Sequence, residues 1–83
     1  MRALDDIALT LKLGQLHPTA VLNTLIATEN EGGLSAVRYL ERQLARSNDA
    51  LREREHPHRA LAEIWLNATR AYLLAQTEQQ RAV

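Results

Sequence analysis

The residues best suited to metal or proton chemistry surround one proline. His56 and His58 flank Pro57, and Glu53 and Glu55 come just before them. Imidazole nitrogens and carboxylate oxygens are ligands for zinc and other transition metals. However, this spacing is a weak signal, because polar residues at a helix corner ordinarily face water and a histidine there can cap the next helix. We therefore predict a solvated corner with no metal and no cofactor.

Nucleophilic catalysis has equally little support. A nucleophile must lie beside a base that a third group orients. Ser35, Ser47 and three histidines are present, but no motif gathers them into one pocket, and the chain has no cysteine. Gly32-Gly33 is typical of a helix stop and not of a phosphate-binding loop. The sequence thus predicts no catalytic residue, no small-molecule substrate and no enzymatic activity.

Length and charge limit the class of protein. The chain has 83 residues, and its 10 Lys and Arg are balanced by 10 Asp and Glu. This length suits a single domain over residues 1–83 with a modest core, which association with another chain would supplement. Zero net charge gives no long-range attraction to nucleic acid or to an anionic membrane. The lack of cysteine fits a reducing compartment, and Asp5, Asp6 and Lys12 argue against a signal peptide, so we predict a cytoplasmic protein.

Helical patterns cover most of the chain after residue 17. Pro18 can open a helix whose apolar face ends at Gly32-Gly33, and Ser35 is a candidate N-cap for the next helix. The residue before a proline avoids the helical region of backbone conformation. His56-Pro57 therefore predicts the end of that helix and the start of another.

The predicted fold is all-α. Short elements occupy residues 1–33, and a long antiparallel helical hairpin occupies residues 34–83 with its corner at His56-Pro57. Apolar residues in the first arm recur at heptad spacing, namely Val37, Leu40, Leu44 and Leu51, with Ser47 in the slot between the last two. The run from Ser47 to Asp49 contains poor helix formers, which can interrupt this arm. We expect the hairpin to assemble as a dimeric helical bundle.

Two structures fit residues 2–13. Leu4, Ile7, Ala8 and Leu11 fit one face of a helix, while Ile7, Leu9, Leu11 and Leu13 alternate with other residues as in a half-buried strand. Periodicity does not separate the two. Composition favours the helix, because Ala, Leu and Lys are helix formers and Gly14 suits a helix C-terminal cap.

The strand alternative resembles one DNA-binding family. A strand at residues 7–13, a helix at 18–31, a glycine-containing turn and a helix from residue 35 follow the element order of the ribbon-helix-helix proteins. In that family two chains pair their strands into a ribbon that enters the major groove. The resemblance implies a dimeric transcriptional regulator with Ala8, Thr10 and Lys12 against the bases. Zero net charge and the single cation among these three residues disfavour nucleic acid as the partner.

The last helical pattern carries apolar residues on two opposite sides. Leu61, Ile64, Ala68, Ala71 and Ala75 recur at alternating steps of three and four, whereas Leu66 and Leu73 lie about 140° round the helix from Leu61. Either the rest of the chain covers both sides or a second copy of the chain covers one, and the extent of the apolar surface favours a second copy. The predicted dimer or partner interface comprises Leu61, Ile64, Trp65, Leu66, Ala68, Tyr72 and Leu73.

A cationic strip precedes the corner. Arg38, Arg42 and Arg46 recur every four residues and share one side of a helix. The strip is either a solvated face that Glu41 and Asp49 screen or a site for an acidic partner. By exclusion, the sequence predicts a small regulatory or inhibitory protein that acts through protein-protein interaction, with itself and another protein as partners and no membrane. A purely structural assembly subunit is a further alternative.

Overall fold

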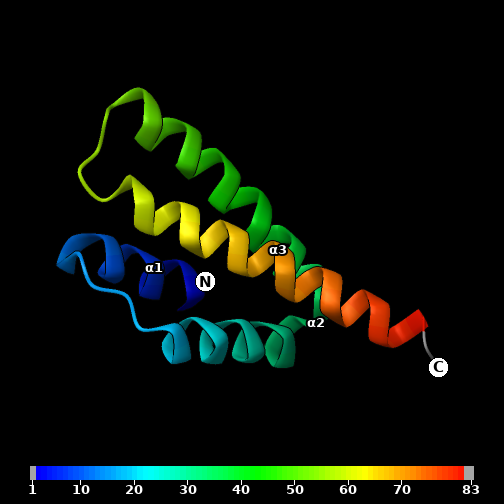
Figure 1. The fold of residues 1–83 in the computed structure, drawn as a ribbon. Helices are drawn as coiled ribbons and strands as arrows, with labels where there is room; N and C mark the ends of the chain where they lie inside the picture. The colour runs from blue at the N-terminus through cyan, green and yellow to red at the C-terminus, as the bar shows by residue number, and fades with distance from the viewer. Residues whose placement is uncertain (1, 82–83) are drawn as a thin grey trace.

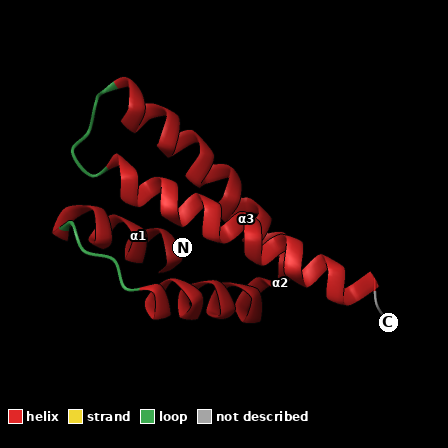
Figure 2. Cartoon of the chain, viewed as in Figure 1, coloured by secondary structure: helices red, strands yellow, loops and turns green. Residues whose placement is uncertain are grey.

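Every element in residues 2–81, the part of the chain that the structure describes, is an α-helix (Figures 1 and 2). In this computed structural model, α1 spans Arg2–Leu13, α2 spans Pro18–Glu53 and α3 spans Arg59–Arg81, with side chains described as far as Gln79. The prediction of an all-α chain is confirmed. Met1, Ala82 and Val83, which the sequence assigns to the same domain, lie outside the described residues.

Residues 7–13 form the second half of α1, so the strand alternative is wrong. The helical period governs this segment because Ala3 and Ile7, one turn apart, are both buried against the other helices. Leu9 and Leu13, which a strand would have buried together with Ile7, are 54% and 61% exposed. Within the described residues no strand is present that could form a DNA-binding ribbon, and the resemblance to the ribbon-helix-helix proteins fails.

A glycine bends α2 without a loop. Gly33 has φ 71° and ψ −171°, so two helical segments meet there at a kink. Residues with a Cβ rarely adopt this φ, which explains why the chain turns at a glycine. The Ser35 hydroxyl donates to the Gly32 carbonyl at 3.1 Å, and no described N–H donates a capping bond to it. The first segment of α2 runs beside α1 and the second runs beside α3 (Figure 1).

The second segment of α2 continues unbroken past the weak helix formers at residues 47–49. Among the residues of α2, only Gly33 has a non-helical conformation. Asn48 is buried and Ser47 is exposed, so Asn48 and not Ser47 fills the slot between Leu44 and Leu51. The Asn48 side-chain oxygen, Oδ1, has no hydrogen-bond partner within the described residues. Packing against α3 therefore overrides both local propensity and the polarity of this side chain.

The turn between α2 and α3 is built around Glu55. Its φ of 52° lies in the left-handed region. The His56 N–H donates to the Leu51 carbonyl at 3.0 Å, and the Glu55 N–H donates to the Arg52 carbonyl at 3.1 Å. These two bonds form a Schellman motif, which satisfies carbonyls at the end of α2. The chain then reverses, and α3 returns alongside the second segment of α2 (Figure 1).

The core lies where α1, both segments of α2, and α3 converge. Its buried apolar members are Ala3, Ile7, Val21, Leu25, Leu40, Leu44, Trp65 and Leu66. Trp65 is the largest fully buried side chain, with 1% of its surface exposed. Burial of a large aromatic contributes more apolar area than any other single side chain here. The α1 helix and the first segment of α2 thus cover one side of α3.

Candidate interaction surface

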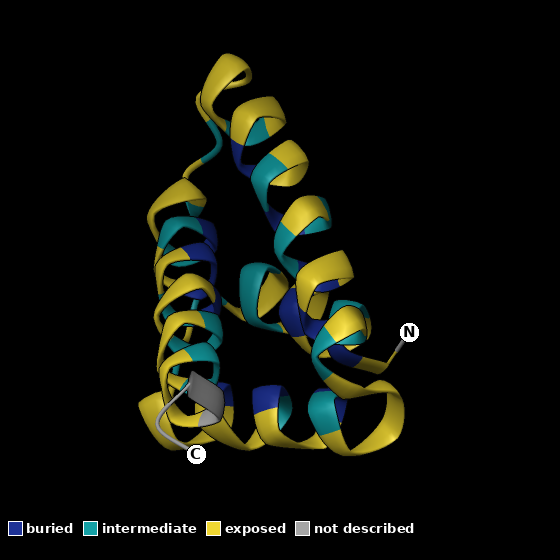
Figure 3. Ribbon diagram, turned by 90° about the vertical axis from the view of Figure 1, so that its right-hand side faces the viewer, coloured by how far each residue is buried: buried dark blue, intermediate teal, exposed yellow. Residues whose placement is uncertain are grey.

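The side of α3 opposite the core is exposed and mostly apolar. We call it the outer strip, and it comprises Ala60, Ile64, Asn67, Ala71, Leu74, Ala75 and Glu78, all of which are exposed or partly exposed. Apart from Ala75, the strip advances in alternating steps of four and three, the spacing with which one helix packs against another. Figure 3 shows exposed residues along the outward side of α3 and buried residues on the side toward the other helices. The strip runs through nearly the whole helix.

The structure divides the interface predicted from the sequence between the two sides of α3. Trp65 and Leu66 belong to the core and are 1% and 5% exposed, so the chain itself covers them. Ile64 is 46% exposed and lies in the outer strip. The other four predicted residues are only partly exposed, namely Leu61, Ala68, Tyr72 and Leu73. Within one copy, only Ile64 of the seven lies in the outer strip.

The sequence-based interface omitted the residue with the most exposed large side chain in the strip. Leu74 is 62% exposed, and it completes the series from Ile64 through Asn67 and Ala71. The signal was present in the sequence, because the steps from Ile64 are three, four and three. Asn67 interrupts this series with a polar side chain, so a pattern of apolar residues alone continues from Ile64 to Ala68 and does not reach Leu74. The amide at position 67 is thus part of the candidate surface.

Two ion pairs hold α3 against α2 along one edge of the outer strip. The Arg52 guanidinium pairs with Glu63. Arg70 Nε lies 3.0 Å from Glu41 Oε1. Both pairs are at least partly exposed, so each contributes only about 0–1 kcal/mol to stability. Glu63 and Arg70 thus mark the edge of the outer strip that faces α2.

Tyr72 holds α3 to the first segment of α2. Its hydroxyl donates a hydrogen bond to Glu29 Oε1. Burial, followed by the hydrogen bond and the negative charge of Glu29, raises the pKa of Tyr72 to about 12. The tyrosine therefore keeps its proton over the ordinary pH range and remains a donor. This contact secures α3 from the side opposite the Arg70 ion pair.

The cationic strip on α2 lies at the surface. Arg38, Arg42 and Arg46 are all at least partly exposed, and no ion pair joins any of them to another described residue. Glu41, which could have screened Arg38 along the same helix, pairs with Arg70 instead. Asp49 is exposed on the same side of α2, so the strip carries one carboxylate near its end. Three guanidinium groups are nevertheless open to an acidic ligand.

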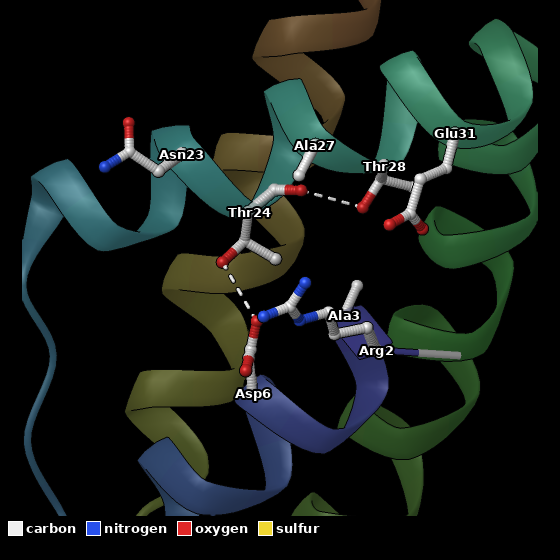
Figure 4. A pocket seen from close by; sticks show the side chains of 8 residues that line it. All are labelled: Arg2, Ala3, Asp6, Asn23, Thr24, Ala27, Thr28 and Glu31. Atoms are coloured by element: carbon white, nitrogen blue, oxygen red, sulfur yellow. Dashed lines mark hydrogen bonds between the residues drawn. The ribbon is translucent and has the colours of Figure 1, made fainter.

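A polar cleft of about 300 Å³ lies between α1 and the first segment of α2. Figure 4 shows Asp6 and Arg2 from α1 facing Thr24 and Thr28 from α2. Thr24 Oγ1 is 3.5 Å from Asp6 Oδ2, and Thr28 Oγ1 donates to the Thr24 carbonyl at 2.7 Å. The Asp6–Thr24 contact joins α1 to the first segment of α2, whereas the Thr28 bond lies within α2.

A bond between a side chain and the backbone stabilises the corner at His56 and His58. His56 Nδ1 accepts a hydrogen bond from the His58 N–H at 3.0 Å, so His56 caps the start of α3 as the sequence suggested. The His58 ring packs against Gly14 at the end of α1. In residues 2–81, no cluster of three or more His, Cys, Asp or Glu side chains could hold a metal ion. The corner thus joins α1 to the turn before α3.

Two further findings bear on function. None of the helices in the described part of the chain is both long enough and apolar enough to cross a lipid bilayer. Comparisons of the chain with family models, with curated proteins and with solved structures each gave no match.

Proposed function

We propose that this chain is a small non-enzymatic regulatory or inhibitory protein that acts by protein-protein interaction as a homodimer. The outer strip of α3 is the observation that carries the proposal. It is a mostly apolar surface about five helical turns long on a helix whose other side is already covered by the core. Association with a second chain removes that surface from water, which is the main driving force of protein association.

Other exposed apolar side chains make shorter patches. Leu9 and Leu13 form one pair on α1, and Leu22 and Ile26 form one pair on the first segment of α2. Each pair covers a single helical turn. A single turn offers a partner two side chains, whereas the outer strip offers seven residues over about five turns. The outer strip is therefore the surface that best fits an extended helical partner.

The regulatory role assigns a separate surface to the second protein. Dimerisation through α3 leaves Arg38, Arg42 and Arg46 on α2 open to a partner. Guanidinium groups bind carboxylates in paired hydrogen bonds, so an acidic segment of another protein is the chemistry that fits this strip. By covering that segment, the dimer would block whatever else the segment binds.

Sedimentation equilibrium of the full chain tests the dimer. The wild type should approach twice its 9.4 kDa chain mass as its concentration rises. Replacing Ile64 and Leu74 together by Ser should leave the chain monomeric. The matched control replaces Leu9 and Leu13 by Ser, an equally exposed pair outside the strip, and should still dimerise. A wild type that stays monomeric at every concentration removes the basis of the proposal.

Affinity capture from host extract tests the masking role. The Arg38→Gln, Arg42→Gln, Arg46→Gln triple variant should dimerise but lose the partner that the wild type captures. A second triple variant, in which Arg2, Lys12 and Arg54 become Gln, changes the net charge equally and should keep the partner. If both triple variants capture the same proteins as the wild type, the arginine strip has no part in binding.

A further inference from the structure

The outer strip has an internal symmetry that bears on how two copies would pair. Thr69 lies at its midpoint on the opposite, buried side of α3. Asn67 and Ala71 lie two positions before and after Thr69, and Ile64 and Leu74 lie five before and after. Ala60 and Glu78 lie nine before and after. A strip that is symmetric about its centre can pair with an inverted copy of itself in full register.

We infer that two copies join through their outer strips in antiparallel orientation, with a two-fold axis beside position 69. This inference rests on the homodimer proposed above and specifies its geometry. Each Ile64 packs against Leu74 of the second copy, and each Asn67 packs against Ala71 of the second copy. Such an interface is isologous, because the same surface contributes to both sides.

The side chains in the strip suit a close approach of two helices. Ala60, Ala71 and Ala75 are small, so the two helix axes can come within about 8 Å, the short end of the usual range. Ile64 and Leu74 are the two large residues. On each side of the two-fold axis, Ile64 of one copy and Leu74 of the other form one layer. The layers are thus filled evenly along a helix of 23 residues, about 34 Å long.

Charge distinguishes the antiparallel from the parallel arrangement. Glu78 is a member of the strip near the C-terminal end of α3. In antiparallel pairing it reaches the first turn of α3 of the second copy, where Arg59 and the positive end of the helix dipole stabilise a carboxylate. In parallel pairing, two Glu78 carboxylates would face each other across the interface. Parallel pairing would also place the two Asn67 amides together, where they could form a hydrogen bond. The repulsion between the two Glu78 carboxylates costs more than that contact contributes, so charge favours the antiparallel arrangement.

Cysteine cross-linking measures the orientation directly, because the chain has no cysteine of its own. The two variants are Ile64→Cys and Leu74→Cys, tested separately and as an equimolar mixture under mild oxidation. Positions 64 and 74 are ten residues apart, so in antiparallel pairing the two thiols of an Ile64→Cys dimer are separated by about 15 Å along the axis. Disulfides form only when the Cα atoms are within about 7 Å.

The antiparallel register predicts a covalent dimer in the mixture and severalfold less in either variant alone. Circular dichroism of each variant checks that it remains folded, which its exposed position favours. Efficient cross-linking of each variant with itself would establish the parallel arrangement and overturn the inference, while the homodimer would stand. A dimer that cross-links in none of the three samples would show that the outer strip is not the interface. A monomeric wild type would instead refute the proposed function.

Charge reversal gives a second measurement on the same register. Glu78→Lys should weaken association in sedimentation experiments, because the introduced ammonium group would face Arg59 of the second copy. Combining Glu78→Lys with Arg59→Glu should restore association, since both charges are exchanged. In a parallel dimer Glu78→Lys would replace one like-charged pair by another, and Arg59→Glu would not rescue it.

Discussion

The hydroxyl of Tyr72 donates a hydrogen bond to the carboxylate of Glu29, and this contact joins residues of two helices that lie 43 positions apart in the chain. Glu29 lies in the first segment of α2, just before the kink at Gly33, while Tyr72 lies on α3. The kink brings the first segment across α3, and the hydrogen bond holds it there. Loss of this bond should loosen the first segment before the rest of the fold.

Tyr72→Phe removes only the hydroxyl and should destabilise the fold by about 1.5–3 kcal/mol, because a hydrogen bond to a charged group contributes about that much. Urea unfolding followed by circular dichroism measures the change. Tyr39→Phe is the matched control, since Tyr39 is 43% exposed. That control should leave the stability within about 0.5 kcal/mol of the wild type. Equal stability of both variants would mean that the Glu29 contact contributes nothing.

The same tyrosine should make the fold sensitive to alkali. Burial and Glu29 raise the pKa of Tyr72 from 10.0 to about 12, so the folded chain holds this proton more tightly than the unfolded chain does. The stabilisation is complete below pH 10 and is lost as pH rises through about 12. Stability profiles of the wild type and Tyr72→Phe should therefore converge over this interval. Parallel profiles would argue against tighter proton binding in the fold.

Asn48→Leu should stabilise the protein by about 1–2 kcal/mol, because it removes a buried polar group without a partner and replaces it with an apolar side chain of the same branching. Thermal unfolding provides the comparison. The neighbouring change Ser47→Leu alters an exposed position and should shift stability by no more than about 0.5 kcal/mol. A destabilised Asn48→Leu variant would indicate that the amide has a function in packing that Leu cannot replace.

Glu55→Gly should raise stability by about 0.5–1 kcal/mol. Glycine relieves the backbone strain at this position, and this gain exceeds the loss caused by the greater entropy of the unfolded chain. Glu55 adopts a left-handed φ of 52°, which strains a residue with a Cβ. Arg54→Gly is the control one residue earlier, where φ is −87° and glycine gives no relief. That variant should lose stability in the same urea titration, and a loss of the same size at both sites would exclude strain at Glu55.

Gly14 and Gly33 should respond differently to alanine. Both have positive φ, and the backbone strain alone should cost about 1–3 kcal/mol at each. A Cβ at Gly14 would also lie 2.7 Å from His58 Cε1, whereas nothing lies within 4 Å of one at Gly33. Gly14→Ala should therefore carry a steric cost in excess of its backbone strain, which Gly33→Ala lacks. Adding His58→Ala should recover that excess in a double-mutant cycle, and failure to recover it would exclude the steric contact.

Local patterns predicted the helices well because each boundary depends on nearby residues. Pro18 opens α2, Gly33 supplies the conformation that bends it, and Pro57 lies in the turn before α3. Residues 2–13 could not be decided by periodicity, since their apolar residues satisfy two periods at once. Packing in the core selects the helix, because Ala3 and Ile7 contact residues that are remote in sequence.

The candidate surface was harder to predict than the helices. The sequence showed that α3 is apolar on two sides but not which side the chain itself covers. That choice depends on long-range contacts, such as Tyr72 with Glu29 and Arg70 with Glu41, which no local pattern contains. As a result, Trp65 and Leu66 were assigned to an interface although they lie in the core, and Leu74 was missed.

The placement of Trp65 gives the chain an optical probe of its own. It is the sole tryptophan, and it sits where α1, both segments of α2, and α3 meet. Its emission should therefore change when any one of these segments separates from the others. The outer strip lies across α3 from the indole, so assembly there should leave the emission almost unchanged. Folding and assembly can thus be followed independently in the unlabelled protein, one by fluorescence and the other by mass.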